Sequence, residues 1–145
     1  MNISTISEIA KATVRRNTEE VQSHGNFAVF DELFSADFVD HTPQPTFGTG
    51  REAVRSLYQA LRKAFPDLRA DIHWQTVEGD RVTTFKTYFG THRGYFLGIA
   101  PTNRPISFEA CDVMSVRDGK ITDHWGVGNL LSVVIQLGAF TSATE

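Results

Sequence analysis

The chain lacks several features that would mark whole classes of protein. One cysteine, Cys111, occurs in 145 residues, which excludes a disulfide framework and favours a reducing compartment, so we expect a cytoplasmic protein. No apolar run approaches the roughly 20 residues of a membrane span, and the N-terminal residues lack the apolar segment of a secretory signal. The net charge is −3 and no arginine or lysine cluster is present, which argues against nucleic acid or a membrane surface as a partner.

Short motifs that identify common cofactors and nucleophiles are also missing. The sequence has no G-x-S-x-G, phosphate loop, dinucleotide fingerprint or HExxH motif. No pair of histidines has the ligand spacing typical of a metal site, so we expect neither a metal nor a cofactor. Cys111 has no predicted base beside it, which argues against a nucleophilic role.

What remains is an ordinary globular composition with an unusual number of phenylalanines. Hydrophobic residues make up 41% of the chain, charged residues 21%, and eleven residues are Phe. A chain of this length buries about 68–70% of its unfolded surface, enough for a core and a cavity. We therefore expect one domain over residues 1–145, with an aromatic core or an aromatic-lined pocket.

Periodicity in the sequence predicts a run of helices followed by a run of strands. Capping boxes over residues 5–8 and 49–52, and a cap at Asn26, begin three helices. The expected strands and a closing helix then cover residues 37–41, 68–74, 81–89, 106–117, 120–129 and 130–137. This order indicates an α+β fold in which helices pack on one face of an antiparallel sheet.

One hairpin has a register that can be worked out from the sequence. The Asp118-Gly119 pair between two alternating strands predicts a type I′ turn. Counting outward from that turn places Asp112 opposite Trp125 on an apolar face of the sheet. A bulge in either strand would shift this pairing.

Asp112 is the candidate acid/base on that face. A carboxylate beside a large aromatic side chain in an apolar hollow is expected to have a raised pKa, which suits proton transfer near neutral pH. The structural alternative is that a hydroxyl or backbone group satisfies Asp112, which then only fixes the sheet. Both interpretations place the side chain inside the protein.

Other polar and aromatic side chains are candidates for ligand contacts. Asp40 and His41 are neighbours on a short strand, so one of them faces inward. Tyr58 lies on the apolar stripe of the third helix, where its hydroxyl reaches either a protein partner or a ligand. The remaining candidate contact residues are Trp74, His92, Phe108, Trp125 and Asn129.

Several segments resemble one family. They are the string GTHRGYFLGIAPTNRPISFEACDVMSVRDGKITDHW with the later QLG, the upstream FSADFVDHTP and the helix start GTGREAV. These are similar to the SnoaL-like polyketide cyclases, which belong to the nuclear transport factor 2-like superfamily. The resemblance extends from about Ile9 to Gly138.

The resemblance implies a fold, a reaction and an assembly. The fold is a cone-shaped α+β barrel in which a curved antiparallel sheet wraps around N-terminal helices and encloses a deep apolar cavity. The name-giving members close the fourth ring of anthracycline precursors by intramolecular aldol condensation, without a metal or cofactor. They associate through the sheet, so we expect a homodimer or a higher homo-oligomer.

The resemblance also suggests roles for individual residues. The acid/base aspartate of the family falls, depending on the alignment, at Gly126 or Asn129, its histidine partner at Asp112, and a polar asparagine at Asp40. The leading hypothesis is an enzyme in which Asp112 removes a proton alpha to a carbonyl of a hydrophobic small molecule and returns it to the new alkoxide. Asp40, as a second catalytic carboxylate, would hydrogen-bond the substrate together with His41 and Asn129.

Two alternatives stay open at this point. Because neither family-aspartate position holds a carboxylate, the first is a non-catalytic carrier of an apolar ligand. The second is a related lyase, isomerase or epoxide-opening enzyme in the same cavity. An arginine beside Asp112 would favour epoxide opening, and a sealed cavity without a buried acid would favour the carrier.

Overall fold

The computed structural model describes residues 2–140, which form a five-stranded sheet and the helices that pack against it. The helical segments are α1 (Ile3–Arg16), η1 (Asn17–Ser23), α2 (Phe27–Leu33), α3 (Arg51–Ala64) and α4 (Leu130–Gln136). The strands are β1 (Phe34–Asp40), β2 (Arg69–Glu78), β3 (Arg81–Thr91), β4 (Pro105–Arg117) and β5 (Lys120–Gly128). None of the helices in this part of the chain has the length and apolar character needed to cross a bilayer.

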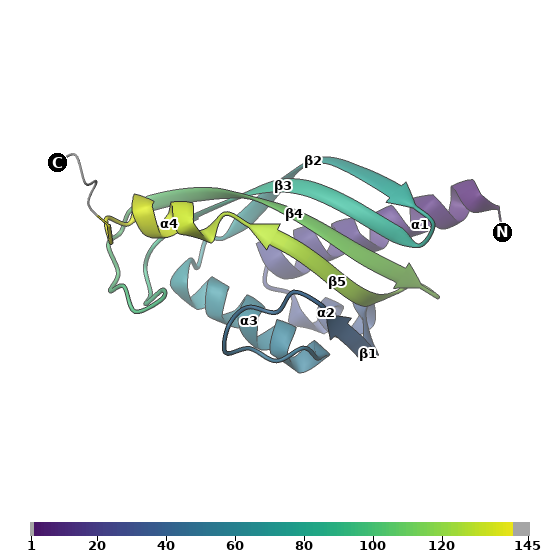
Figure 1. The fold of residues 1–145 in the computed structure, drawn as a ribbon, viewed down its shortest axis with the longest axis horizontal. Coiled ribbons are helices and arrows are strands. Elements are labelled where there is room, and N and C mark those ends of the chain that lie inside the picture. The colour runs from purple at the N-terminus through teal and green to yellow at the C-terminus, as the bar shows by residue number, and fades with distance from the viewer. Residues whose placement is uncertain (1, 141–145) are drawn as a thin grey trace.

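The sheet is curved and has the strand order β1-β5-β4-β3-β2. Strands β2 to β5 pair antiparallel, whereas β1 joins β5 in parallel. Helices α1 and α3 lie against one face of the sheet, and α4 lies at its far end (Figure 1). The expected α+β class is confirmed, with two differences in detail: the sheet is mixed, and it stays open because β1 and β2 are both edge strands.

The β4–β5 hairpin begins as predicted and then departs from the predicted register. Asp118 and Gly119 both have positive φ angles, 51° and 72°, as a type I′ turn requires. Two residue pairs beyond the turn, a bulge shifts the pairing by one residue. Asp112 therefore lies opposite Gly126, and the prediction that it lies opposite Trp125 is wrong.

The bulge also exchanges the faces of two aromatic side chains. His124, expected on the wetter face, pairs with Met114 and turns toward the interior. Trp125 turns to the outer face, where its ring stacks on that of His41 at 4.4 Å between ring centroids, and the Arg81 guanidinium lies over Trp125 at 4.6 Å. One extra residue in a strand thus decides which ring reaches the interior.

A second register shift, in β2, moves another predicted contact residue outward. It lies between Ile72 and Trp74 in the pairing of β2 with β3. Trp74, expected on the apolar side of an alternating strand, is 49% exposed and stacks on Phe85 of the outer face. The outer face therefore carries both tryptophans, and the homo-oligomer expected through this face stays a prediction.

The helix starts differ slightly from those predicted. The Asn2 side chain accepts a hydrogen bond from the Thr5 backbone N–H at 2.8 Å, so α1 begins three residues earlier than the predicted capping box. Glu8, expected to complete that box, instead forms an ion pair with Lys11 at 2.9 Å. Helix α3 begins one residue later than predicted, with Gly50 at its N-cap.

The continuation of α1 is a π-helical segment, η1. Its buried side chains are Asn17, Thr18, Val21 and Gln22, of which three are polar. A π-helix closes i→i+5 hydrogen bonds and is frequently found at functional sites. The widened turn brings Asn17 and Gln22, five residues apart, to the same buried side.

Two clusters of apolar side chains form the core. The first joins α1, η1, α2 and β1 to the sheet through residues such as Val14, Phe30, Phe34 and Ile121. The second joins the end of α3 to β4 and α4 through residues such as Phe65, Phe108 and Val133. The candidate site described below lies where residues of both clusters meet.

The first cluster can be tested on β5 with two apolar residues of opposite exposure. Ile121 is fully buried, so we expect Ile121→Ala to lower the free energy of unfolding by about 2–5 kcal/mol. Val127 is 77% exposed, so Val127→Ala should change it by less than about 0.5 kcal/mol. Urea denaturation of both variants measures the difference, and equal losses would contradict this description of the core.

Candidate active site

A cavity lies between the inner face of the sheet and helix α3. Its volume is about 110 Å³. Most of its wall is apolar, contributed by Phe34, Phe38, Val54, Leu57, Leu61, Phe108, Ala110, Met114, Val127 and Leu130. Polar side chains gather on one part of the wall, and they come from β1, β3, β4, β5, η1 and α3.

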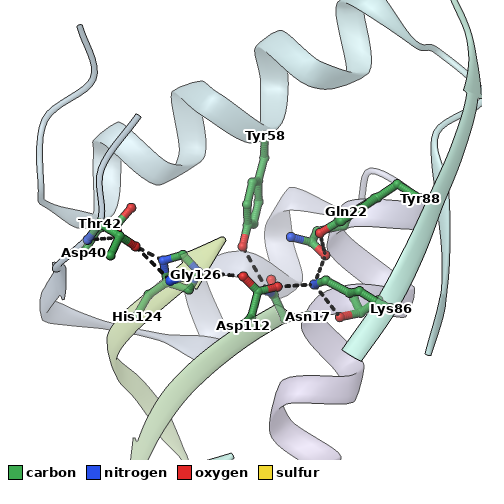
Figure 2. A network of polar contacts seen from close by, with 11 residues as sticks. Asn17, Gln22, Asp40, Thr42, Tyr58, Lys86, Tyr88, Asp112, His124 and Gly126 are labelled. Atoms are coloured by element: carbon green, nitrogen blue, oxygen red, sulfur yellow. Dashed lines mark hydrogen bonds and ion pairs between the residues drawn. The ribbon is translucent and has the colours of Figure 1, made fainter. Parts of the chain in front are cut away.

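Four charged side chains form a line in which Asp40, His124 and Asp112 belong to that polar part and Lys86 lies behind Asp112 (Figure 2). The Asp40 carboxylate accepts a hydrogen bond from His124 Nδ1 at 2.9 Å, and the Asp112 carboxylate accepts one from His124 Nε2 at 2.8 Å. Lys86 Nζ lies 2.8 Å from the other oxygen of Asp112. Negative and positive groups therefore alternate, and each carboxylate has a cationic partner.

Further polar groups satisfy the remaining hydrogen bonds of Lys86. Its ammonium group donates to Thr18 Oγ1 at 3.4 Å and to Gln22 Oε1 at 3.1 Å, in addition to Asp112. Gln22 Oε1 also accepts from the Tyr88 hydroxyl at 2.9 Å. Lys86 is 1% exposed, and a cation buried to that degree is stable only when it is paired and fully hydrogen-bonded.

The ion pair fixes the charge state of Asp112 and Lys86. Burial alone would raise the pKa of Asp112, but the charges of Lys86 and His124 outweigh it and hold that pKa well below its usual range. Burial would lower the pKa of Lys86, but the Asp112 charge raises it above its usual value. The raised pKa expected for Asp112 is therefore wrong, because sequence reasoning did not include these two partners.

His124 is held as a cation between two carboxylates. Burial would lower its pKa, but the hydrogen bonds to Asp112 and Asp40 raise the pKa of His124 to about 9. At neutral pH both ring N–H groups are then present, and both are donated within the site. His124 in turn lowers the pKa of Asp40 against the opposing effect of burial.

Gly126 permits the close contact between Asp112 and His124. A Cβ atom at position 126 would lie 2.6 Å from Asp112 Oδ1 and 2.6 Å from His124 Nε2, closer than non-bonded atoms approach. The Gly126 backbone N–H donates to Thr42 Oγ1 at 2.8 Å, and Thr42 N–H donates to Asp40 Oδ1 at 3.0 Å. The absence of a side chain at 126 is thus a structural condition for the charged line.

Four of the residues predicted from the sequence line the cavity: Asp112, Asp40, Tyr58 and Phe108. His41 and Trp125 stack on each other outside it, and His41 Nε2 bonds to Asp123 at 2.9 Å. Trp74 is also on the outer face, for the reason given above. His41, Trp125 and Trp74 are therefore not part of the cavity wall.

The last two predicted contact residues have other partners. His92 is fully buried in the loop between β3 and β4, where Thr102 N–H donates to its Nδ1 at 3.1 Å. Its Nε2 has no hydrogen-bond partner among residues 2–140, and His92 is not part of the cavity wall. Asn129 caps α4 by accepting from Ser132 N–H at 3.3 Å.

Sequence reasoning did not single out Lys86, Gln22 or Asn17, and it placed His124 on the wrong face. A signal existed for Lys86: it stands among Val82, Thr84 and Tyr88 at every second position of β3. The other side of that strand carries Phe85 and Phe89, which made the buried face ambiguous. The signal for His124 was cancelled by the bulge.

With this geometry established, comparison with known proteins identifies the family. The model of the SnoaL-like polyketide cyclases matches residues 12–137. The chain belongs to this family. The relationship confirms the resemblance of the sequence segments described above.

The chain is also similar to individual members of the family, one in sequence and one in structure. The nogalonic acid methyl ester cyclase of Streptomyces nogalater is 30% identical over 111 residues, which cover 74% of this chain and 82% of that enzyme. The structure of IdmH from Streptomyces antibioticus, a proposed polyketide cyclase, matches 89% of this chain and 98% of IdmH, with a TM-score of 0.78 and 29% identity.

A third comparison bears on the fold alone. A proposed SnoaL-like polyketide cyclase from Jannaschia sp. CCS1 superposes with a TM-score of 0.84, covering 97% of this chain and 99% of that one, at 24% identity. The open, curved sheet with its helices on one face is thus the fold of SnoaL-like proteins.

The charge state of His124 is directly measurable. We expect His124 to titrate near pH 9 in the NMR spectrum of its ring nitrogens, and at lower pH in Asp40→Asn, which removes one of the two carboxylates that raise its pKa. Asp123→Asn, which removes a carboxylate bonded to the outer His41, is the matched control and should leave the His124 titration unchanged.

Stability should follow the same titration. Because folding raises the pKa of His124 from about 6.5 to about 9, its contribution is complete below pH 6.5 and is lost as the pH rises through 9. The loss is roughly 3 kcal/mol for a shift of this size. A free energy of unfolding that stays level between pH 6.5 and 9 would contradict the assignment.

Gly126 offers a test with a close control on the same strand. We expect Gly126→Ala to separate Asp112 from His124 and to lower the pKa of His124, since the added methyl group would collide with both. Gly128→Ala places its Cβ 3.9 Å from the nearest atoms, an ordinary contact, and should leave the titration as it is. The same NMR measurement distinguishes the two, and an unchanged spectrum in Gly126→Ala would disprove the packing argument.

Proposed function

We propose that this protein is a cofactor-free cyclase of the aldol type that acts on a hydrophobic, carbonyl-bearing small molecule. The observation that carries the proposal is the buried Asp112 carboxylate in the wall of a mostly apolar cavity. An apolar wall suits a hydrophobic ligand, and a fixed carboxylate suits the transfer of one proton. Membership of the polyketide cyclase family agrees with both.

The proposed reaction moves one proton twice. Asp112 accepts a proton from a carbon next to a carbonyl group: the C–H bond breaks, an O–H bond forms on the carboxylate, and the electron pair is delocalised onto the carbonyl oxygen as an enolate. The enolate carbon then attacks a second carbonyl carbon and forms the new C–C bond. The resulting alkoxide takes the proton back, so Asp112 ends the cycle as a carboxylate.

The environment of Asp112 limits the substrates that we propose. Lys86 and His124 hold its pKa low, so Asp112 is a weak base. A weak base removes a proton only from an acidified carbon, because proton transfer follows the difference between the two pKa values. We therefore propose a substrate whose reacting carbon lies between two carbonyl groups, as in a β-keto ester.

Position 126 gives a second line of support. The family resemblance assigns the acid/base aspartate to Gly126 or Asn129, and the Asp112 carboxylate oxygen lies 2.6 Å from where a Cβ at 126 would be. A carboxylate from β4 thus occupies the space in which a side chain from β5 would begin. We propose that Asp112 takes over the role of the family aspartate from the neighbouring strand.

The alternatives have less support. A carrier of an apolar ligand has no need for two buried ion pairs, whose desolvation costs several kcal/mol per ion. An arginine beside Asp112 would favour epoxide opening, but the cation beside Asp112 is Lys86. Both alternatives remain as outcomes of the experiment.

The test is turnover of nogalonic acid methyl ester, the substrate named for the relative from Streptomyces nogalater. Ring closure is an isomerisation, so the expected product has the same mass and a new chromatographic retention time. We expect Asp112→Asn to lower kcat by about 10²-fold or more, because it removes the proton acceptor. Asp123→Asn, on the outer face, should retain the wild-type rate.

A second variant guards against loss of the fold. Asp112→Asn leaves the Lys86 charge buried without a partner, which is strongly destabilising. The double variant Asp112→Asn with Lys86→Met removes both charges, and we expect it to fold and to be equally inactive. Wild-type rates in either variant would remove Asp112 from the mechanism, and tight ligand binding without product in the wild type would favour the carrier.

A further inference from the structure

Two hydrogen-bond donors on buried side chains of the polar wall of the cavity have no acceptor among residues 2–140. They are the hydroxyl of Tyr58, on α3, and the side-chain amide nitrogen of Gln22, on η1. Both residues line the cavity, and both are at least nine-tenths buried. A buried donor that the protein leaves unused is available to a ligand.

The orientation of the Gln22 amide is determined by its oxygen. Oε1 accepts from Lys86 at 3.1 Å and from Tyr88 at 2.9 Å, so the oxygen is directed toward β3. The –NH₂ group of a planar amide must then point the other way. In Figure 2 the Gln22 amide nitrogen is directed away from Lys86 and Tyr88, toward the side on which Tyr58 lies.

The orientation of the Tyr58 hydroxyl is determined by Asn17. In the amide orientation that the structure gives Asn17, which leaves Asn17 Oδ1 without a partner among residues 2–140, Asn17 Nδ2 donates to the Tyr58 oxygen at 3.0 Å. In this orientation the Tyr58 oxygen acts as an acceptor and its own proton has no acceptor. Burial raises the pKa of Tyr58 above its usual value, so the hydroxyl keeps that proton. Figure 2 shows the ring extending from α3 toward Asp112.

The cations of the site are not available for the same purpose. Lys86 has three N–H donors and three acceptors, and both ring N–H groups of His124 bond to carboxylates. An oxygen atom that develops negative charge near Asp112 therefore finds its free partners in Tyr58 and Gln22.

We propose that Tyr58 and Gln22 are catalytic residues that together bind the oxyanion formed when Asp112 removes a proton. This inference rests on the proposed function and adds the group that stabilises its intermediate. Preorganised donors aimed at a developing oxyanion are the usual means of making such an intermediate accessible. The ligand class that fits is a neutral carbonyl compound whose oxygen lies between α3 and η1, with its acidic carbon next to Asp112.

The first test uses 2-naphthol, whose ionised oxygen imitates an enolate and whose ultraviolet absorbance distinguishes the neutral and ionised forms. Donors to the oxygen lower the pKa of the bound probe. We expect that pKa to be higher by about one unit in Tyr58→Phe than in the wild type. Tyr95→Phe, which alters an exposed tyrosine on the loop after β3, is the matched control and should give the wild-type value.

Gln22 needs its own control, because its oxygen also supports Lys86 and Tyr88. Gln22→Met removes the donor together with that acceptor, whereas Tyr88→Phe breaks one of the same bonds and leaves the Gln22 amide in place. We expect Gln22→Met to raise the pKa of the bound probe by more than Tyr88→Phe does. Wild-type values in both Tyr58→Phe and Gln22→Met would mean that these protons are used within the protein, and would overturn the proposal.

A second measurement separates this proposal from the proposed function. Exchange of the acidic hydrogen of 2-methoxycarbonyl-1-tetralone, a β-keto ester, for deuterium, followed by NMR and corrected for the rate without protein, reports proton removal without ring closure. We expect exchange in the wild type and about 100-fold slower exchange in Tyr58→Phe. The loss should appear as a lower kcat with little change in KM, because the donor stabilises the oxyanion more than the bound ketone. Exchange at equal rates in both proteins would overturn the donor pair and leave Asp112 as the base. A shifted probe pKa without any exchange would support the donor pair and refute proton removal.

Discussion

The ion pair between Lys86 and Asp112 is the interaction on which the interior of this protein depends. Each charge alone would cost several kcal/mol to bury, and each is acceptable only because the other is 2.8 Å away. The pair accounts for the polar residues around it, since Thr18, Gln22 and His124 satisfy the hydrogen bonds that the ions do not give each other. Only one arrangement of β3, β4 and η1 brings all of these groups within hydrogen-bonding distance of one another, so the buried charges fix how these three elements pack.

Two local irregularities make that arrangement possible. The bulge in the β4–β5 hairpin turns His124 inward, and the glycine at 126 lets its ring approach Asp112. The π-helical turn places Asn17 and Gln22 on one side, where a regular α-helix would separate residues five apart. These two departures from ideal strand and helix geometry border the charged line, as expected where a site imposes its own requirements on the backbone.

The same irregularities limit how much of the site could be predicted from the sequence. Periodicity and turn chemistry identified the α+β order, the Asp118-Gly119 turn and an inward-facing Asp112, because these depend on neighbouring residues. The partners of Asp112 depend on contacts distant in sequence: Lys86 is reached through a long loop whose length fixes no register, and His124 through a bulge without a sequence signature. The pKa of Asp112 was therefore predicted in the wrong direction although its inward orientation was predicted correctly.

The charge pattern also limits the kind of catalysis that this cavity supports. Fixed partners keep Asp112 ionised over a wide pH range, but the same partners make it a weak base. A weak base forms an enolate only if the enolate itself is stabilised, either by a second carbonyl group in the substrate or by donors in the wall. The unused donors of Tyr58 and Gln22 lie in the same cavity wall as Asp112. In the proposed mechanism they compensate for the weakness of the base, because hydrogen bonds to the enolate oxygen lower the energy of the enolate that the base must form.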